Sequence, residues 1–137
     1  MRKTMTITFN ILCVIAAVII IGYITMLIMG IRPAVVISGS MEPTIRTGSL
    51  IFVDTTYRSL KEDDIVAFRT GGSLVTHRLV RDTGEGWITK GDANSCEDPW
   101  RISENNIIGK TVFWIPGIGF LIGKEAMLWG KNYSCCL

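Results

Sequence analysis

The hydrophobic pattern first defines an uncharged apolar run at residues 11–29. At about 1.5 Å per residue, such a helix crosses most of a hydrocarbon core of about 30 Å, and apolar flanks from Met5 to Ile31 add the rest. A buried core helix is the alternative, but a chain of 137 residues has no interior that could surround a helix apolar on every side. The pattern predicts a transmembrane anchor at residues 11–31.

A cleaved signal peptide is the competing interpretation of this run. Its apolar region would span about 7–15 residues and end at a small-x-small cleavage site. This run is longer and is followed by Gly30-Ile31-Arg32-Pro33, a poor site, which favours an uncleaved anchor. Because Arg2 and Lys3 precede the span and only Arg32 closely follows it, the positive-inside bias places residues 1–10 in the cytoplasm and the rest outside.

Short β-type runs follow the anchor, separated by turn residues and without helical patterns between them. They lie at residues 34–38, 49–54, 64–69, 73–81, 86–90 and 107–114. This spacing is typical of a small all-β domain, which we place at residues 32–114. The predicted fold class is therefore mostly β, with one N-terminal transmembrane helix.

Residues 115–137 are apolar but broken by Pro116 and by several glycines, and Lys124 and Glu125 interrupt them. That falls short of a clean second span. Trp129 suits the membrane interface, as does Trp114 just before the segment. We expect a membrane-interfacial C-terminal tail or a β-rich edge.

Charge and cysteine usage exclude some classes of function. A net charge of +2 without a Lys/Arg cluster argues against a nucleic-acid partner. One histidine and no C-x-x-C argue against a zinc site. A disulfide from Cys96 to the adjacent Cys135 or Cys136 stays open, without support from spacing.

Candidate chemistry begins with V-I-S-G-S-M-E-P-T at residues 36–44, where two small hydroxyls precede a proline. The stretch is either ordinary turn chemistry or the seat of a serine nucleophile. A nucleophile needs a base, and the sole histidine, His77, lies on a predicted strand on the same face as Val75 and Leu79. A half-buried histidine satisfied by a backbone carbonyl is the alternative.

An acid that orients the base should come from a loop that a strand positions. Residues 89–99 form such a loop, with Asp92, Glu97 and Asp98 among them. A solvated polar turn is the alternative interpretation.

Four motifs in order resemble the type I signal peptidases, and within them the ER-type branch found in the ER, archaea and some Gram-positive bacteria. They are Ser38-Gly39-Ser40-Met41-Glu42-Pro43, Gly48-Ser49-Leu50-Ile51, Val75-Thr76-His77-Arg78, and Lys90-Gly91-Asp92-Ala93-Asn94 leading to Asp98. The resemblance runs from the anchor to about Trp114. It implies a small β catalytic domain of the signal-peptidase type.

The resemblance also assigns roles. It implies Ser40 as nucleophile and His77 as general base, where the ordinary bacterial branch has a lysine. Asp98 matches the acid that orients the histidine, and Asp92 is the second candidate. Ser38 matches a hydroxyl of the oxyanion hole, with the Ser40 backbone N–H as the other donor. No cofactor or metal is implied, and we expect Met41 to be an apolar group on the membrane-facing side.

The function that the resemblance implies is a membrane-bound serine endopeptidase that removes signal peptides from preproteins. It would cut after small residues on the non-cytoplasmic face of the cell membrane or the ER. Its partners would be preproteins and the lipid bilayer, and the resemblance also allows partner subunits of a secretion or processing complex. The alternatives are a self-cleaving repressor-type peptidase, with a Ser–Lys dyad and a DNA-binding domain, and a non-catalytic membrane-anchored module.

Overall fold

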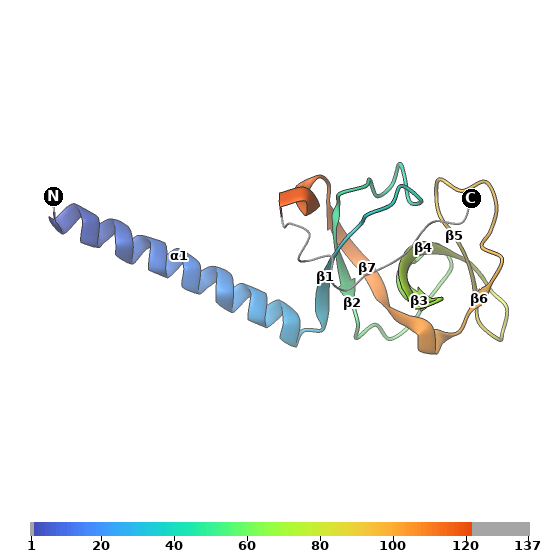
Figure 1. Cartoon of the computed structure of the whole chain (residues 1–137). Helices are drawn as coiled ribbons and strands as arrows, with labels where there is room; N and C mark the ends of the chain where they lie inside the picture. The colour runs from blue at the N-terminus through green and yellow to red at the C-terminus, as the bar shows by residue number, and fades with distance from the viewer. Residues whose placement is uncertain (1, 122–137) are drawn as a thin grey trace.

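The computed structural model describes residues 2–121, in which one long helix precedes a seven-stranded sheet (Figure 1). Helix α1 spans Arg2–Ile28. The strands are β1 (Ile31–Val35), β2 (Leu50–Asp54), β3 (Ile65–Thr70), β4 (Ser73–Asp82), β5 (Trp87–Lys90), β6 (Arg101–Ile102) and β7 (Ile107–Ile115). Two 3₁₀ turns, η1 (Glu104–Asn106) and η2 (Ile118–Leu121), flank β7.

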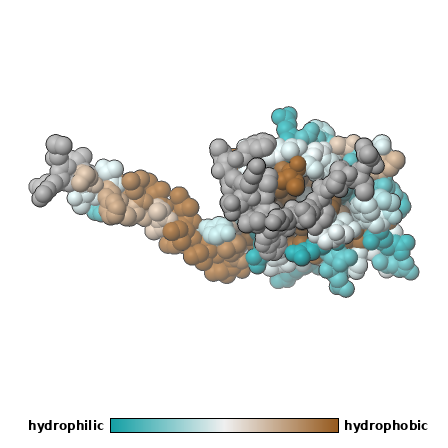
Figure 2. Space-filling model, viewed as in Figure 1, coloured by the Kyte–Doolittle hydropathy of each residue, from teal (hydrophilic) through white to brown (hydrophobic). Residues whose placement is uncertain are grey.

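Helix α1 has the length and composition of a membrane span. Its candidate span, Met5–Ile28, has 24 residues and a mean hydropathy of 3.0, and none of it is buried against the rest of the protein. Much of the helix surface is accordingly apolar, whereas polar residues dominate the visible surface of the β domain (Figure 2). A helix of this length reaches about 36 Å at about 1.5 Å per residue, enough to cross a bilayer.

Gly30 marks the change from helix to sheet. Its φ of 77° lies in the left-handed region that glycine adopts without steric cost. Its carbonyl accepts hydrogen bonds from the backbone N–H and the hydroxyl of Thr55, at 2.9 and 2.7 Å. The chain therefore enters β1 at Ile31, within the segment predicted to end the anchor, and the first strand begins earlier than its sequence pattern indicated.

The sheet confirms the predicted fold class, a mostly β domain after one apolar helix. Every strand pair is antiparallel, in the order β1-β2-β7-β3-β4-β5-β6. Strand β7, the last strand among the described residues, lies between β2 and β3 and so joins the two halves of the sheet. Only the start of the predicted tail is described: Gly119 in η2 donates a hydrogen bond to the Gly48 carbonyl, and the rest lies outside the described residues.

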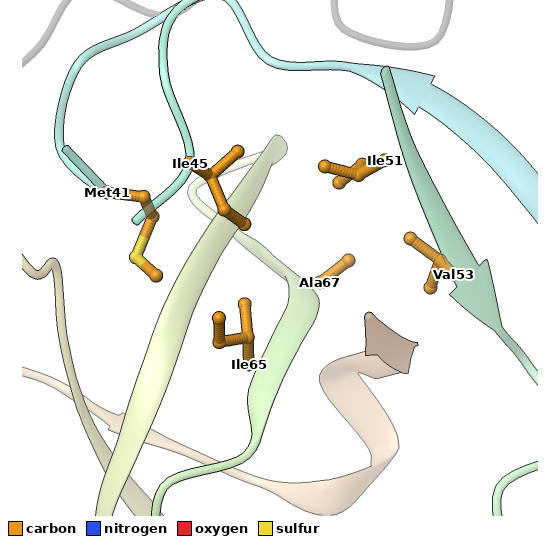
Figure 3. Close-up of a cluster of buried hydrophobic side chains, with 6 residues drawn as sticks. All are labelled: Met41, Ile45, Ile51, Val53, Ile65 and Ala67. Carbon is orange, nitrogen blue, oxygen red and sulfur yellow. The ribbon is translucent and has the colours of Figure 1, made fainter. Parts of the chain in front are cut away.

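Apolar side chains cover the central sheet on both faces. The first cluster contains Met41, Ile45, Ile51, Val53, Ile65 and Ala67 (Figure 3). The second cluster contains Val66, Phe68, Leu79, Trp87, Ile102 and Ile107. Successive residues of β3 point to opposite faces and are buried on both, so β3 is the centre of the fold.

Met41 belongs to the first cluster, and the expectation that it faces the membrane is wrong. Its side chain is 1% exposed and packs beside Ile45, from the same loop between β1 and β2. The Ile45 N–H bonds the Met41 carbonyl at 2.9 Å, which closes one helical turn and directs both side chains inward. Met41 therefore anchors to the core the loop that carries Ser40.

Thr111 in β7 offers a test of this packing. It is buried opposite Val53, and its hydroxyl is a buried side-chain group without a hydrogen-bond partner among the described residues. Because an unpaired buried hydroxyl is unfavourable, Thr111→Val should raise the free energy of unfolding by about 1 kcal/mol. Denaturant unfolding in detergent measures this, and a less stable variant would contradict it.

Candidate active site

Three segments bring Ser40, His77 and Asp98 together. Ser40 lies in the loop between β1 and β2, His77 in the middle of β4, and Asp98 in the loop between β5 and β6. The distance from His77 Nε2 to Ser40 Oγ is 3.1 Å, and from His77 Nδ1 to Asp98 Oδ2 it is 2.6 Å. Residues 37 and 21 positions apart thus form one continuous chain of polar contacts.

Apolar neighbours hold the imidazole of His77. The residue pairs with Val66 across β3 and β4, and its ring meets the Phe68 ring edge-on, with centroids 6.2 Å apart. Val75 and Leu79, which strand alternation places on the same face, pack in the second cluster. The side chain is buried, so its orientation is fixed by packing and by the groups at its two nitrogens.

The contacts define the direction in which protons are donated. An ionised carboxylate only accepts hydrogen bonds, so Nδ1 of a neutral His77 carries the proton and donates it to Asp98. Nε2 is then free to accept the proton of the Ser40 hydroxyl. This is the arrangement that general-base activation of a serine requires.

Thr89 completes the surroundings of Asp98 and was not singled out from the sequence. Its hydroxyl donates to Asp98 Oδ2 at 2.6 Å, and its carbonyl accepts the Asp98 N–H at 2.8 Å. Thr89 and Trp87 lie on the same, inward face of β5, and Thr89 is fully buried. In the sequence Thr89 is an ordinary β-branched strand residue, and nothing marks its hydroxyl as a partner of Asp98.

The nucleophile candidate is held from a different direction by the turn at residues 91–94. The Ala93 N–H donates to the Ser40 carbonyl at 2.9 Å. A Cβ added to Gly91 would lie 2.6 Å from that same oxygen, so a side chain there would force the turn away from Ser40. The glycine of the fourth motif is thus required for close approach, a role that its motif alone does not reveal.

Asp92, in this same turn, is paired with Arg78 and not with His77. The Arg78 Nε and an Nη donate to its two carboxylate oxygens at 2.9 and 2.7 Å. These hydrogen bonds, helped by one from Thr44, hold the pKa of Asp92 below its ordinary value, and the same pairing raises the pKa of Arg78. Of the two acids proposed to orient the histidine, the structure places Asp98 against it.

Ser38 lies beside the Ser40 hydroxyl, with the two Oγ atoms 3.4 Å apart, and it is exposed. The loop that carries both serines closes on itself through Glu42, whose carboxylate accepts the Thr47 N–H and hydroxyl at 3.1 and 3.0 Å. These bonds lower the pKa of Glu42. The serines therefore open to solvent from a loop that is fixed on both sides.

Cys96, in the same loop as Asp98, has an exposed thiol, and Cys135 and Cys136 lie outside the described residues. Within residues 2–121, no group of three or more His, Cys, Asp and Glu side chains is arranged to hold a metal ion.

The Arg78–Asp92 pair should contribute stability that depends on pH. Because the pKa of Asp92 is lowered in the folded state, its contribution is complete above the unfolded value of about 3.9 and is lost as the pH falls through the folded value. Asp92→Asn should therefore cost about 1 kcal/mol at neutral pH, with the difference from wild type vanishing in more acidic solution.

Urea unfolding at several pH values measures this. Glu97→Gln is the matched control, since its pair with Arg81 is much more exposed, and it should change stability little at any pH. A deficit of Asp92→Asn that persists undiminished at acidic pH would contradict the prediction.

Comparison with known families identifies the segment that contains these residues. Residues 33–112, more than half of the chain, match the family model described as Peptidase S24-like. Ser40, His77, Asp92 and Asp98 all fall within the matched segment.

Individual relatives of the chain are also named as peptidases. The chain is 39% identical over 89 residues to "Signal peptidase I W" of Bacillus subtilis, covering 59% of this chain and 47% of that protein. It is 36% identical over 104 residues to "Signal peptidase complex catalytic subunit sec11" of Sclerotinia sclerotiorum, covering 64% of this chain and 59% of that protein. The chain thus spans between about half and three-fifths of the length of these curated relatives.

Proposed function

Since the chain belongs to the Peptidase S24-like family, we propose that it is a type I signal peptidase, a membrane-bound serine endopeptidase that removes signal peptides from exported preproteins. The observation that carries this proposal is the chain of contacts from the Ser40 hydroxyl through His77 to Asp98. The names of the relatives support the same activity.

In the proposed reaction, Ser40 Oγ attacks the scissile carbonyl carbon while His77 Nε2 takes the hydroxyl proton. The tetrahedral intermediate collapses, the C–N bond breaks, and His77 gives the proton to the leaving amine. Water, deprotonated by His77, then attacks the acyl carbon, the bond from that carbon to Ser40 Oγ breaks, and His77 returns the proton to Ser40 Oγ. Asp98 keeps the Nδ1–H in place throughout and stabilises the imidazolium that forms.

The oxyanion that forms in each half-reaction requires donors near Ser40. We assign this role to the Ser40 backbone N–H and to the Ser38 hydroxyl, whose oxygen lies 3.4 Å from Ser40 Oγ. An exposed hydroxyl so close to the nucleophile can rotate toward the developing charge. Donors of this kind contribute about 3–4 kcal/mol of transition-state stabilisation.

The membrane location supports this choice of substrate. Helix α1 is long and apolar enough to cross the bilayer, and only two residues separate its end from the first strand of the β domain. We propose that the N-terminus is cytoplasmic and that the β domain works on the outer face, where the cleavage site of a preprotein emerges. By resemblance, cleavage follows small residues. One relative is named the catalytic subunit of a complex, which supports partner subunits here as well.

Replacing the nucleophile or the base should abolish processing. Ser40→Ala and His77→Ala should each slow cleavage of a labelled preprotein, in detergent or vesicles, by about 10³-fold or more, and the double variant should be no slower than either single variant, because the two groups act as one unit. Ser103→Ala, which removes an exposed hydroxyl with no capping bond, is the matched control and should cleave normally.

Wild-type rates in either active-site variant would refute the mechanism, whereas the absence of cleavage by the wild-type chain would favour a non-catalytic module. The two acids are compared in the same assay. Asp98→Asn should lose far more activity than Asp92→Asn, because only Asp98 contacts the imidazole. Equal losses would contradict the assignment of Asp98.

The proposed orientation predicts that trypsin added outside intact cells digests the β domain. Arg58 and Lys61 are exposed in the connection between β2 and β3 and offer cleavage sites. Cells opened with detergent provide the reference digest. Complete protection in intact cells, with digestion after opening, would reverse the orientation.

A further inference from the structure

Among the described residues, Thr89 supplies the buried hydroxyl that contacts Asp98. We propose that Thr89 is a positioning residue that fixes the Asp98 carboxylate so that His77 keeps the tautomer needed for catalysis. This inference rests on the proposed function, because it concerns the same site. It adds a residue that does not touch substrate and acts only through Asp98.

Two hydrogen bonds join Thr89 to Asp98. Its hydroxyl donates to Oδ2 at 2.6 Å, and its carbonyl accepts the Asp98 N–H at 2.8 Å. The same Oδ2 receives His77 Nδ1 at 2.6 Å. One carboxylate oxygen therefore accepts two short hydrogen bonds, and the backbone bond fixes the point from which the side chain starts.

Burial explains why a hydroxyl is needed at this place. Asp98 is only 8% exposed, so little water reaches its carboxylate, and a buried carboxylate is costly unless protein donors satisfy it. Thr89 occupies an inward position of β5 in line with Trp87 of the second cluster, where valine would fill the same space. What threonine adds there is one donor, and it is directed at Asp98.

The consequence for His77 follows from the shared oxygen. With the Thr89 bond in place, the carboxylate cannot rotate away without losing a second donor. Without that bond, rotation becomes easier and the Nδ1–H is held less firmly. In a fraction of the molecules the imidazole then carries its proton on Nε2, and a protonated Nε2 cannot accept the proton of Ser40.

The test uses the full chain in detergent micelles and compares Thr89→Val and Thr89→Ser with wild type. Because His77 is the only histidine in the sequence, ¹⁵N NMR of a chain with a histidine-free tag reports its tautomer without ambiguity. We expect predominantly Nδ1–H in wild type and in Thr89→Ser. Thr89→Val should show a larger Nε2–H fraction, faster exchange of the Nδ1–H with water, and about fivefold to tenfold lower kcat at unchanged KM.

Thr111→Val is the matched control, because it makes the same change at a buried hydroxyl that bonds nothing among the described residues. It should leave the tautomer and kcat at their wild-type values. If Thr89→Val does not fold, Thr89→Ser and Thr89→Ala, which differ only in the hydroxyl, replace it in the comparison.

A wild-type tautomer and Nδ1–H exchange rate in the variant that lacks the hydroxyl would overturn the proposal, as would equal changes in Thr111→Val. Failure of the proposed function is distinguishable from this outcome. A wild-type chain that cuts no preprotein would refute the peptidase assignment, whereas the NMR comparison would still decide the role of Thr89.

Discussion

The buried hydrogen bond between His77 and Asp98 is the contact on which the rest of the site depends. A carboxylate removed from water must be satisfied by protein donors, and Asp98 obtains them from the imidazole and from the Thr89 hydroxyl, while its own backbone N–H donates to the Thr89 carbonyl of β5. Its position is therefore determined by the sheet, and the position of the imidazole follows from it. Ser40 needs only to be brought to the remaining nitrogen.

Strand β4 serves both halves of the site through the alternation of its side chains. His77 pairs with Val66 of the second cluster, and the next residue, Arg78, pairs with Ile65 of the first. His77 thus meets Asp98, while Arg78 binds Asp92 in the turn that holds the Ser40 carbonyl. Two consecutive residues on opposite faces of one strand connect His77 and Ser40 to the same short segment after β5.

The core explains why an exposed loop can carry a well-positioned serine. Met41, directly after Ser40, is buried with Ile45 in the first cluster, and the loop is closed by the bonds between Glu42 and Thr47. The serine side is therefore anchored on one face of the sheet and the histidine on the other. Packing of the two clusters on β3 keeps both at hydrogen-bonding distance.

The sequence by itself determined the long apolar helix and the mostly β class, because both follow from patterns of hydrophobic residues that are local in the chain. It also named Ser40, His77 and two acids through motifs in a fixed order. Only the tertiary structure decided which of these groups touch: Asp98 and not Asp92 lies against the histidine. The burial of Met41 and the contact of the Thr89 hydroxyl with Asp98 could likewise not be predicted from the sequence. Each depends on distances between strands that are far apart along the chain, and no local pattern encodes such distances.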